Sequence, residues 1–257
     1  MGKRKKARNR KGSIALMMQT IISIVYAALL VHMTVLLVRS RTQGWFSTII
    51  AYFPQLVIII SSMSLQFVLR IRHRAHTQDG SLLPLLFTFI ALESSMILPI
   101  YYDVSGISIL PPSTIIFLSR FSLLSAAILF TFSAVQFFGT NLSKMWLYLI
   151  SAIGASLFVS IAIPLNTTTS SSMIFTSSYD AYFLVLITLI YIAAAATYIA
   201  AVAKDRATHS VTRSAAFIFL IIGNYLSIGT DIVTGVLSVV IYVAGIIMLS
   251  ISAKNTF

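Results

Sequence analysis

The sequence predicts an all-α membrane protein, a polytopic bundle of about eight membrane-spanning helices, and three observations support this prediction. Apolar runs fill the chain from Ser13 to Ser252, and several reach the roughly 20 residues that a helix needs to cross about 30 Å of hydrocarbon. The composition is 58% hydrophobic and 9% charged, which leaves too little polar surface for a water-soluble domain of 257 residues. The short connections are alternately rich and poor in Lys and Arg.

The chain begins with a basic tail, residues 1–12, which holds seven of the eighteen basic residues. A basic segment directly before an apolar helix is typical of a cytoplasmic topogenic signal, and it also predicts contact with anionic lipid headgroups. Nucleic acid is not an expected partner, because no aromatic residue is interleaved with these charges. The following stretch, 13–38, is longer than the roughly 7–15 residues of a signal-peptide core, so it is the first predicted span.

Five further spans follow from apolar runs that polar connections separate. They are predicted at about 46–69, 82–100, 114–138, 146–164 and 181–203. The last apolar stretch, 214–252, is too long for one crossing and is interrupted around residues 227–231, which predicts two helices of roughly 15 and 20 residues. Eight spans result. Seven are the alternative, in which the segment 214–227 is re-entrant or broken at Gly223 and Asn224.

These elements form one predicted unit, a bundle over 13–253 with a short C-terminal segment, 254–257. A cytoplasmic tail puts the following basic residues on the cytoplasmic side: Arg70, Arg72, Arg74, Lys144, Lys204, Arg206, Arg213 and Lys254. Only Arg39 and Arg41 are then on the outer side, so both termini are predicted to be cytoplasmic. The chain has no cysteine, so disulfides and thiol chemistry are excluded. A cysteine-free membrane chain with a lysine-rich start is typical of a bacterial inner membrane, which is the expected location.

Small residues predict where the helices touch. Membrane helices gain little from hydrophobicity against one another and associate through close approach of small side chains. The sequence therefore predicts contact faces at Ala196 and Ala200, one turn apart in the sixth span, and around Gly154 in the fifth.

The candidate site is an intramembrane polar layer of His32, Glu93 and Arg120. Each residue lies about six or seven positions from the proposed outer end of its span, roughly 10 Å deep at about 1.5 Å per residue. A charge in a membrane helix normally faces the bundle interior and finds a partner. Glu93 and Arg120, on consecutive antiparallel helices, are therefore predicted to pair, either to fix helix register or as part of a functional site. The alternative for Arg120 is that it extends to the outer headgroups.

The sequence contains no convincing catalytic or metal-binding motif. The sequence contains no nucleophile elbow, no phosphate-binding loop and no zinc-protease motif, and it predicts no cofactor. The pair His73 and His76 has a spacing that metal sites use, but it lies in a basic segment that is unsuited to a divalent cation. The sequence therefore gives no positive sign of an enzyme.

Three classes of function remain open. Transport of a small solute would use the polar layer and an interrupted seventh span, as discontinuous helices do in known transporters. A seven-helix-like membrane sensor or signalling partner would act through a separate cytoplasmic protein, which the basic segments 70–81 and 204–213 would contact. An intramembrane enzyme is third, and only Glu93 with His32 offers it an acid and a base.

Overall fold

The computed structural model describes residues 2–40, 45–75, 82–105, 110–137, 145–163, 168–169, 175–176, 180–204, 208–227 and 232–252. Eight α-helices occupy these ranges: α1 (Gly2–Ser40), α2 (Trp45–Ala75), α3 (Leu82–Ser105), α4 (Pro112–Phe137), α5 (Met145–Ala162), α6 (Asp180–Lys204), α7 (Thr208–Leu226) and α8 (Ile232–Ser252). Two two-residue strands, β1 (Thr168–Thr169) and β2 (Phe175–Thr176), pair antiparallel between α5 and α6.

Six of these helices contain a segment long and apolar enough to cross a membrane. The segments are Met17–Arg39, Tyr52–Arg70, Pro84–Ser105, Pro112–Gln136, Tyr182–Ala200 and Val233–Ser252. The apolar parts of α5 and α7, Leu147–Ala162 and Val211–Leu226, are shorter. The predicted fold class, a helical membrane bundle of about eight helices, is confirmed.

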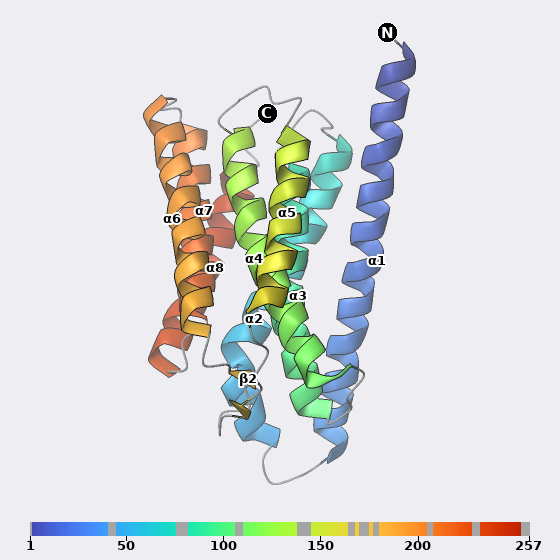
Figure 1. The fold of residues 1–257 in the computed structure, drawn as a ribbon, viewed down its shortest axis with the longest axis vertical. Helices are drawn as coiled ribbons and strands as arrows, with labels where there is room; N and C mark the ends of the chain where they lie inside the picture. Colours follow the sequence, from blue (N-terminus) through green and yellow to red (C-terminus); the bar gives the residue numbers. More distant parts are fainter. Residues whose placement is uncertain are drawn as a thin grey trace.

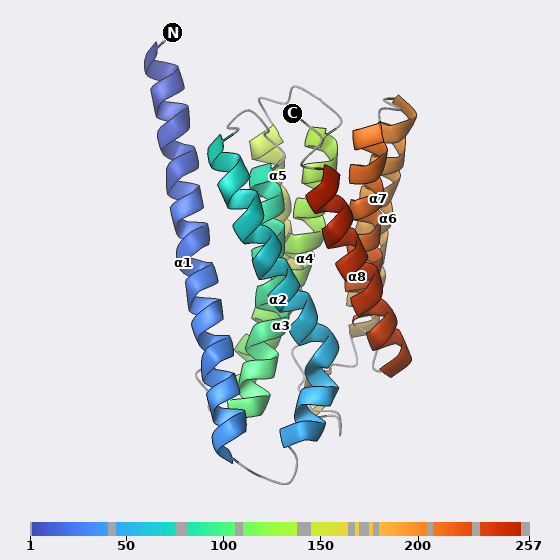
Figure 2. The same cartoon turned by 180° about the vertical axis from the view of Figure 1, so that it is seen from behind.

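Successive helices run in opposite directions, so that α1 begins and α8 ends at the same end of the bundle (Figures 1 and 2). Large apolar side chains face outward, among them Phe158 of α5 and Val233 of α8, which are 73% and 78% exposed. Apolar exposure on this scale would be unfavourable in water and suits a lipid environment. The protein is therefore a multi-pass membrane protein.

Six helices form a closed ring, and the contacts around it repeat. In the first half α2 packs on α3 and α3 on α4; in the second half α6 packs on α7 and α7 on α8. The halves join through two equivalent contacts, α4 with α6 and α8 with α2. Corresponding helices run in the same direction (Figure 1). The remaining helices lie outside the ring. Helix α1 packs against α3 and more loosely against α2, and α5 packs against α4.

Aromatic side chains fill the centre of the ring. The Phe130 ring of α4 meets Phe89 of α3, Tyr191 of α6 and Phe217 of α7 edge to face, with centroids 6.3–6.4 Å apart. These geometries are favourable for aromatic pairs beyond the area that they bury. The two halves of the ring therefore share one packed core.

Helices α7 and α8 approach each other closely at glycines. A Cβ atom on Gly223 would lie 2.8 Å from the backbone nitrogen of Tyr242, and one on Gly245 would lie 3.0 Å from the carbonyl oxygen of Ala216. Helix α7 runs without a break through Gly223 and Asn224. The structure therefore contradicts a break at these residues, which is one of the two forms of the seven-span alternative.

The predicted contact face at Ala196 and Ala200 of α6 is wrong. Around Gly154 of α5 the contact is made by Ser156, which is buried with its Oγ 3.4 Å from Oγ of Ser125 on α4, and not by Gly154 itself. Gly154 has open space where a Cβ would project, and Ala196 and Ala200 are exposed. The buried face of α6 instead carries Ile187, Tyr191, Ala194 and Tyr198. The reason is that a small side chain permits close approach but does not require it, since in lipid it is equally stable on an outward face.

A buried polar network as the candidate functional site

A set of buried and half-buried polar side chains lies where α1, α2 and α3 pack together. We call it the polar network and define it by Gln19, Ser23 and Tyr26 of α1, Gln66 and Arg70 of α2, and Glu93 and Ser94 of α3. The spacing of these residues explains their shared face. Positions 19, 23 and 26, like positions 66 and 70, lie three or four residues apart, which places them in line along one side of a helix.

Gln66 is the centre of this network. Its Nε2 donates a hydrogen bond to Oε1 of Glu93, and its Oε1 accepts bonds from Nε2 of Gln19 at 2.5 Å and Oγ of Ser23 at 3.1 Å. The side chains of Gln19, Gln66 and Glu93 are almost completely buried, at 0%, 1% and 1% exposure. An amide serves this position because it donates from one atom and accepts at the other.

Arg70 supplies the positive charge that acts on Glu93. Its Nη2 donates to Oγ of Ser23 at 2.6 Å, and its guanidinium attracts the Glu93 carboxylate electrostatically. The other carboxylate oxygen of Glu93, Oε2, has no hydrogen-bond partner among the described residues. A buried polar atom without a partner is unfavourable. Glu93 therefore keeps a vacant acceptor position for a proton or a donor group.

Polar groups continue from the network across the ring. Ser62, one turn before Gln66, shares a hydrogen bond of 2.6 Å with the hydroxyl of Tyr242 on α8. The Tyr242 hydroxyl lies near enough to Glu93 and to Tyr191 for a negative charge on either group to act on it. Tyr191 accepts a hydrogen bond from Nδ2 of Asn224 at 2.7 Å. The α2–α8 contact thus links the polar network to buried polar groups of the second half.

The structure gives the three predicted layer residues different partners. Glu93 belongs to the polar network, as described. Arg120 is also buried, with 4% exposure, and its Nη1 donates to the carbonyl oxygen of Ile163, just beyond the end of α5, at 3.5 Å. His32 is exposed, and its Nδ1 shares a hydrogen bond of 2.9 Å with the hydroxyl of Tyr101. The contacts of the described residues do not bring these three together.

Helix rotation accounts for the separation of Glu93 and Arg120. Oγ of Ser119 donates to the carbonyl oxygen of Ser95 at 2.7 Å, so α3 and α4 touch at this level. Arg120 is the next residue and is turned by about 100° around the helix, which directs it away from α3. Glu93 faces α2 instead. Equal depth on neighbouring helices therefore does not make two side chains face each other.

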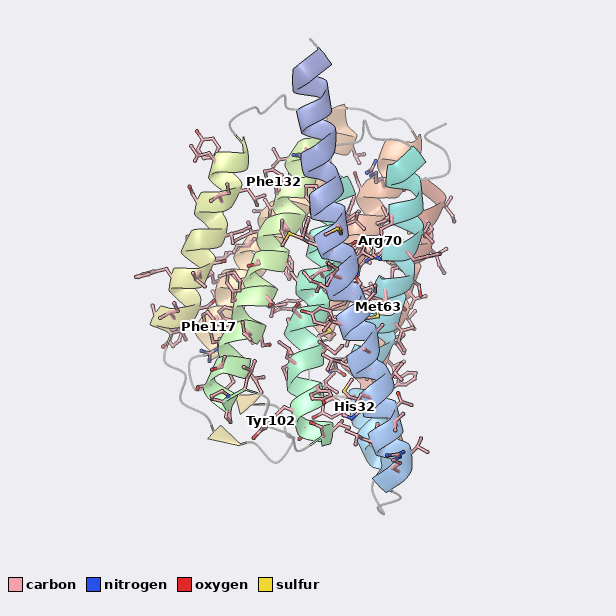
Figure 3. The ribbon with its side chains drawn as sticks, turned by 90° about the vertical axis from the view of Figure 1, so that its right-hand side faces the viewer. His32, Met63, Arg70, Tyr102, Phe117 and Phe132 are labelled. Carbon is pink, nitrogen blue, oxygen red and sulfur yellow. The ribbon has the colours of Figure 1, made fainter. Side chains whose placement is uncertain are left out.

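His32 differs in depth as well. Its partner Tyr101 comes eight residues after Glu93 on α3, which is about 12 Å along the helix. Figure 3 shows His32 well separated along the bundle from Arg70, which belongs to the polar network.

Sequence reasoning missed most of the network. It assigned Arg70 to a cytoplasmic connection, whereas α2 continues to Ala75 and carries Arg70 within the helix. A sequence signal did exist: Gln19, Ser23 and Tyr26 form a polar stripe on an otherwise apolar helix, and Gln66 is four residues before Arg70.

The described residues contain no group of three or more acidic, histidine or cysteine side chains that could hold a metal ion. Of the histidine pair, His73 lies in α2 with no described side chain, and His76 lies outside the described residues. Comparison with known proteins finds no matching family model, no similar curated protein and no similar solved structure.

Proposed function

We propose that this protein is a membrane transporter for a small polar solute, and that Glu93 is the group that binds the proton or the cationic part of the solute. The observation that carries the proposal is the burial of Glu93, at 1% exposure within the span Pro84–Ser105, with Oε2 unpaired. Ionisable side chains at such positions are unfavourable and commonly belong to substrate or proton pathways.

The repeated contacts of the ring support the same proposal. Many transporters consist of two structurally repeated halves, and their substrate and coupling-ion sites lie between the halves near the middle of the membrane. The halves α2–α4 and α6–α8 meet at the α2–α8 contact, where Ser62 and Tyr242 share their hydrogen bond beside Glu93. The polar network is therefore next to the boundary between the halves.

A charge change at Glu93 has a direct structural consequence in this arrangement. When Glu93 takes up a proton, its attraction to Arg70 disappears, and Arg70 also holds α1 through its bond to Ser23. Protonation therefore weakens an electrostatic link between α2 and α3 at Arg70, the residue that also holds α1. This is a physical route from ion binding to helix movement, which alternating access requires.

Solid-supported membrane currents test the proposal. The external concentration of one solute class at a time is raised rapidly around proteoliposomes, with and without an inward proton gradient. The classes are amino acids, sugars, polyamines and small carboxylates. The wild-type protein should give currents with one class, and Glu93→Gln should abolish the dependence on the gradient. The control Asp180→Asn, which removes an acid at the start of α6, should behave as wild type. Absence of currents with every class would contradict transport.

A sensor is the second candidate, and the attachment of α1 favours it. This helix contacts the bundle through the polar network, exposes much of its apolar surface and continues to Gly2 beyond the span Met17–Arg39. A shift of α1 would reach the cytoplasmic side directly. A solute that raises the thermal unfolding midpoint without crossing the liposome membrane would favour this candidate over transport.

We further propose that the end of the bundle at which α1 begins faces the cytoplasm of a bacterial inner membrane. The basic residues of segment 1–12 support this orientation, and they would then lie near anionic headgroups of the cytoplasmic leaflet. Helix α1 begins and α8 ends at the same end of the bundle, which supports an even number of crossings (Figure 1).

A further inference from the structure

Helix α2 carries polar side chains along one side of its membrane-spanning segment, and we call this row the polar stripe. It consists of Gln55, Ser62, Gln66 and Arg70, which are spaced by seven, four and four residues. At about 100° per residue, these positions fall within roughly 80° of one another around the helix. The last two belong to the polar network, and the first two bond residues of the second half. The polar stripe therefore leads from the end of the bundle at which α2 begins to the polar network.

The first residue of the polar stripe meets the adjoining ends of α7 and α8. Nε2 of Gln55 donates to the carbonyl oxygen of Ser227, just beyond the end of α7, at 3.4 Å. A Cβ atom on Gly235 would lie 2.8 Å from Cγ of Pro54, so the first turn of α8 lies beside this part of α2. Oε1 of the half-buried Gln55 has no hydrogen-bond partner among the described residues. In the proposed orientation, this is the outer end of the bundle.

Asn224 continues the line of polar groups about one turn deeper. Its Nδ2 donates to the hydroxyl of Tyr191, and its Oδ1 has no partner among the described residues although the side chain is 0% exposed. The residue before it, Gly223, packs against Tyr242 of α8, whose hydroxyl lies near enough to Glu93 for a negative charge there to act on it. The polar groups of the second half therefore reach Glu93.

Three buried oxygen atoms mark this line, namely Oε1 of Gln55, Oδ1 of Asn224 and Oε2 of Glu93, and none has a donor among the described residues. A buried acceptor without a donor is unfavourable, and water commonly satisfies such atoms where several polar groups surround it. From Gln55 to Gln66, which bonds Glu93, the line extends about 16 Å along α2. Atoms so far apart cannot surround one ion. They suit a file of water molecules, and hydrogen-bonded water conducts protons.

Beyond Glu93 the polar stripe ends in a positive charge. Arg70 is one turn further along α2 than Gln66, and its guanidinium acts on Glu93. A positive charge at this position repels an approaching proton, strongly so in a medium of low dielectric constant. The charge therefore favours approach to Glu93 from the outer end.

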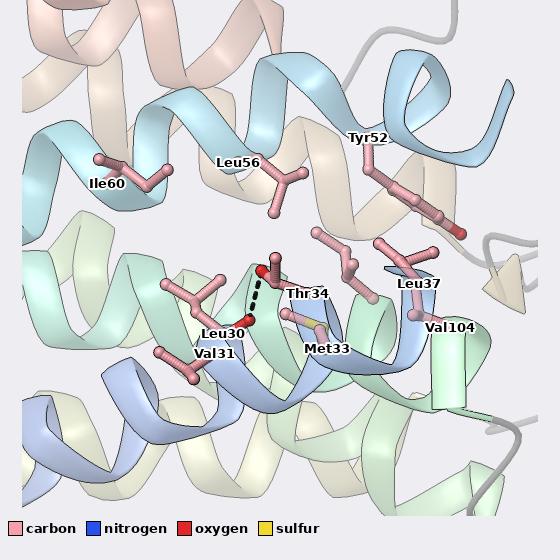
Figure 4. A pocket seen from close by; sticks show the side chains of 10 residues that line it. Leu30, Val31, Met33, Thr34, Leu37, Tyr52, Leu56, Ile60 and Val104 are labelled. Carbon is pink, nitrogen blue, oxygen red and sulfur yellow. Dashed lines mark hydrogen bonds between the residues drawn. The ribbon is translucent and has the colours of Figure 1, made fainter. Parts of the chain in front are cut away.

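The apolar groove of about 220 Å³ between α1 and α2 is not an alternative route (Figure 4). Its walls on α2 include Leu56 and Ile60, which are turned by about 100–160° from Gln55 and Ser62. The hydroxyl of Thr34 in its lining donates to the backbone of its own helix. Such a lining does not provide the several polar partners that water needs.

We propose that Glu93 takes up a proton from the outer side, through water molecules held by Gln55, Asn224 and Tyr242 along the polar stripe. The inference rests on the proposed function and orientation, and it specifies the proton as the coupling ion and the side from which it enters. In the transfer itself, a hydronium ion gives its proton to Oε2 of Glu93. The carboxylate becomes a carboxylic acid and the hydronium ion becomes water, with no other bond changed. The described conformation is then the one that is connected to the outer side.

Carbodiimide labelling tests the route, because the reagent reacts with protonated carboxyl groups in apolar surroundings and mass spectrometry locates the labelled residue. Membrane vesicles with the orientation of the cell receive the reagent while the pH is lowered rapidly on one side only. In the wild-type protein, early labelling of Glu93 should be several-fold higher with acid outside than with acid inside. Asn224→Leu and Gln55→Leu each remove polar atoms that hold water, so each should bring this ratio close to one.

Tyr225→Phe is the matched control, since it removes a hydroxyl from the residue next to Asn224 that is 42% exposed on the outward side of α7. It should keep the wild-type ratio. Thermal unfolding in detergent shows which variants fold, and Gln55→Leu at the half-buried outer end provides the test if Asn224→Leu does not. The proposal is overturned if wild-type Glu93 is not labelled, if its labelling is equal from both sides or higher with acid inside, or if the folded leucine variants keep the wild-type ratio.

The same measurement separates this route from the transport proposal. Preferential labelling from outside in a protein that gives no solute currents would keep the route and contradict transport. Solute currents in a protein whose Glu93 is labelled equally from both sides would keep transport and contradict the route.

Discussion

At the scale of single residues, Gln66 decides how Glu93 is accommodated inside the membrane. Its amide is bonded at both ends, to Glu93 on α3 and to Gln19 and Ser23 on α1. A buried network of this kind stabilises the fold when every member has its hydrogen-bond partners. It contributes much less when one member is removed. The residue next to the charge therefore matters as much as the charge itself.

Gln66→Leu should destabilise the protein more than Glu93→Gln. The leucine leaves Oε1 of Glu93 without a donor and Gln19 without its acceptor, a loss of about 2–3 kcal/mol, whereas Glu93→Gln keeps a bonding partner for Gln66 and should cost less than about 1 kcal/mol. Unfolding in mixed micelles measures both. Ser64→Ala is the control, because Ser64 is exposed and bonds only within its own helix. Equal losses from the two network variants would argue against Gln66 as the centre.

Double-mutant cycles distinguish the two candidate partners of Glu93. Because Arg70 acts on Glu93 while Arg120 bonds the Ile163 carbonyl, Glu93→Gln should couple with Arg70→Gln by about 1 kcal/mol or more. It should be additive with Arg120→Gln within about 0.5 kcal/mol. Free energies of unfolding provide the measurement. Coupling with Arg120 instead would restore the predicted polar layer of Glu93 and Arg120.

At the scale of secondary-structure elements, α7 and α8 form the tightest pair, because glycines let their backbones meet. Helix α5 is the opposite case, since it contacts the ring through α4 and exposes much of its surface. The same residue type, glycine, therefore has different consequences on these helices. At Gly223 it is required by packing, and at Gly154 it is not.

Gly223→Ala and Gly154→Ala should change stability in opposite directions. The alanine at position 223 would meet the Tyr242 backbone at 2.8 Å, and the overpacking should cost about 1–3 kcal/mol. At position 154 nothing lies within 4 Å, and alanine should stabilise the helix by up to about 1 kcal/mol through its higher propensity. Thermal unfolding in detergent checks both variants. A destabilised Gly154→Ala would indicate a contact on the outer face of α5.

At the scale of the whole molecule, the ring of two similar halves surrounds a shared aromatic core, and α1 and α5 lie outside it. Among the described helices the halves meet along two edges, α2 with α8 and α4 with α6, and in the core, where Phe130 of α4 packs on Phe217 of α7. Relative movement of the halves therefore requires rearrangement at these two contacts and around Phe130.

Both ends of the chain should be on the cytoplasmic side, because the even number of helices returns the chain to the side of its basic tail. A C-terminal fluorescent protein should fluoresce, and a C-terminal alkaline phosphatase should be inactive. The reverse pair of results, with a phosphatase placed after Ser105 as an active control in the outward orientation, would contradict the eight-helix topology.

The sequence by itself determined the membrane class and most of the helix boundaries, and it favoured eight helices over seven. The length of an apolar run is a local property, and it suffices because every crossing must satisfy its backbone as a helix within a fixed hydrocarbon thickness. The break between α7 and α8 could be predicted for the same reason, because the apolar run 214–252 is longer than one membrane crossing needs.

Only the tertiary structure decided which side chains meet. In a water-soluble helix the apolar stripe reveals the inward face, but a membrane helix is apolar on all sides, so the sequence contains little information on its rotation. Glu93 therefore turned toward Gln66 rather than Arg120, and Ala196 turned outward while Ala194 turned inward. Rotation is fixed by close packing such as that of Gly223 on Tyr242, which joins residues distant in the chain.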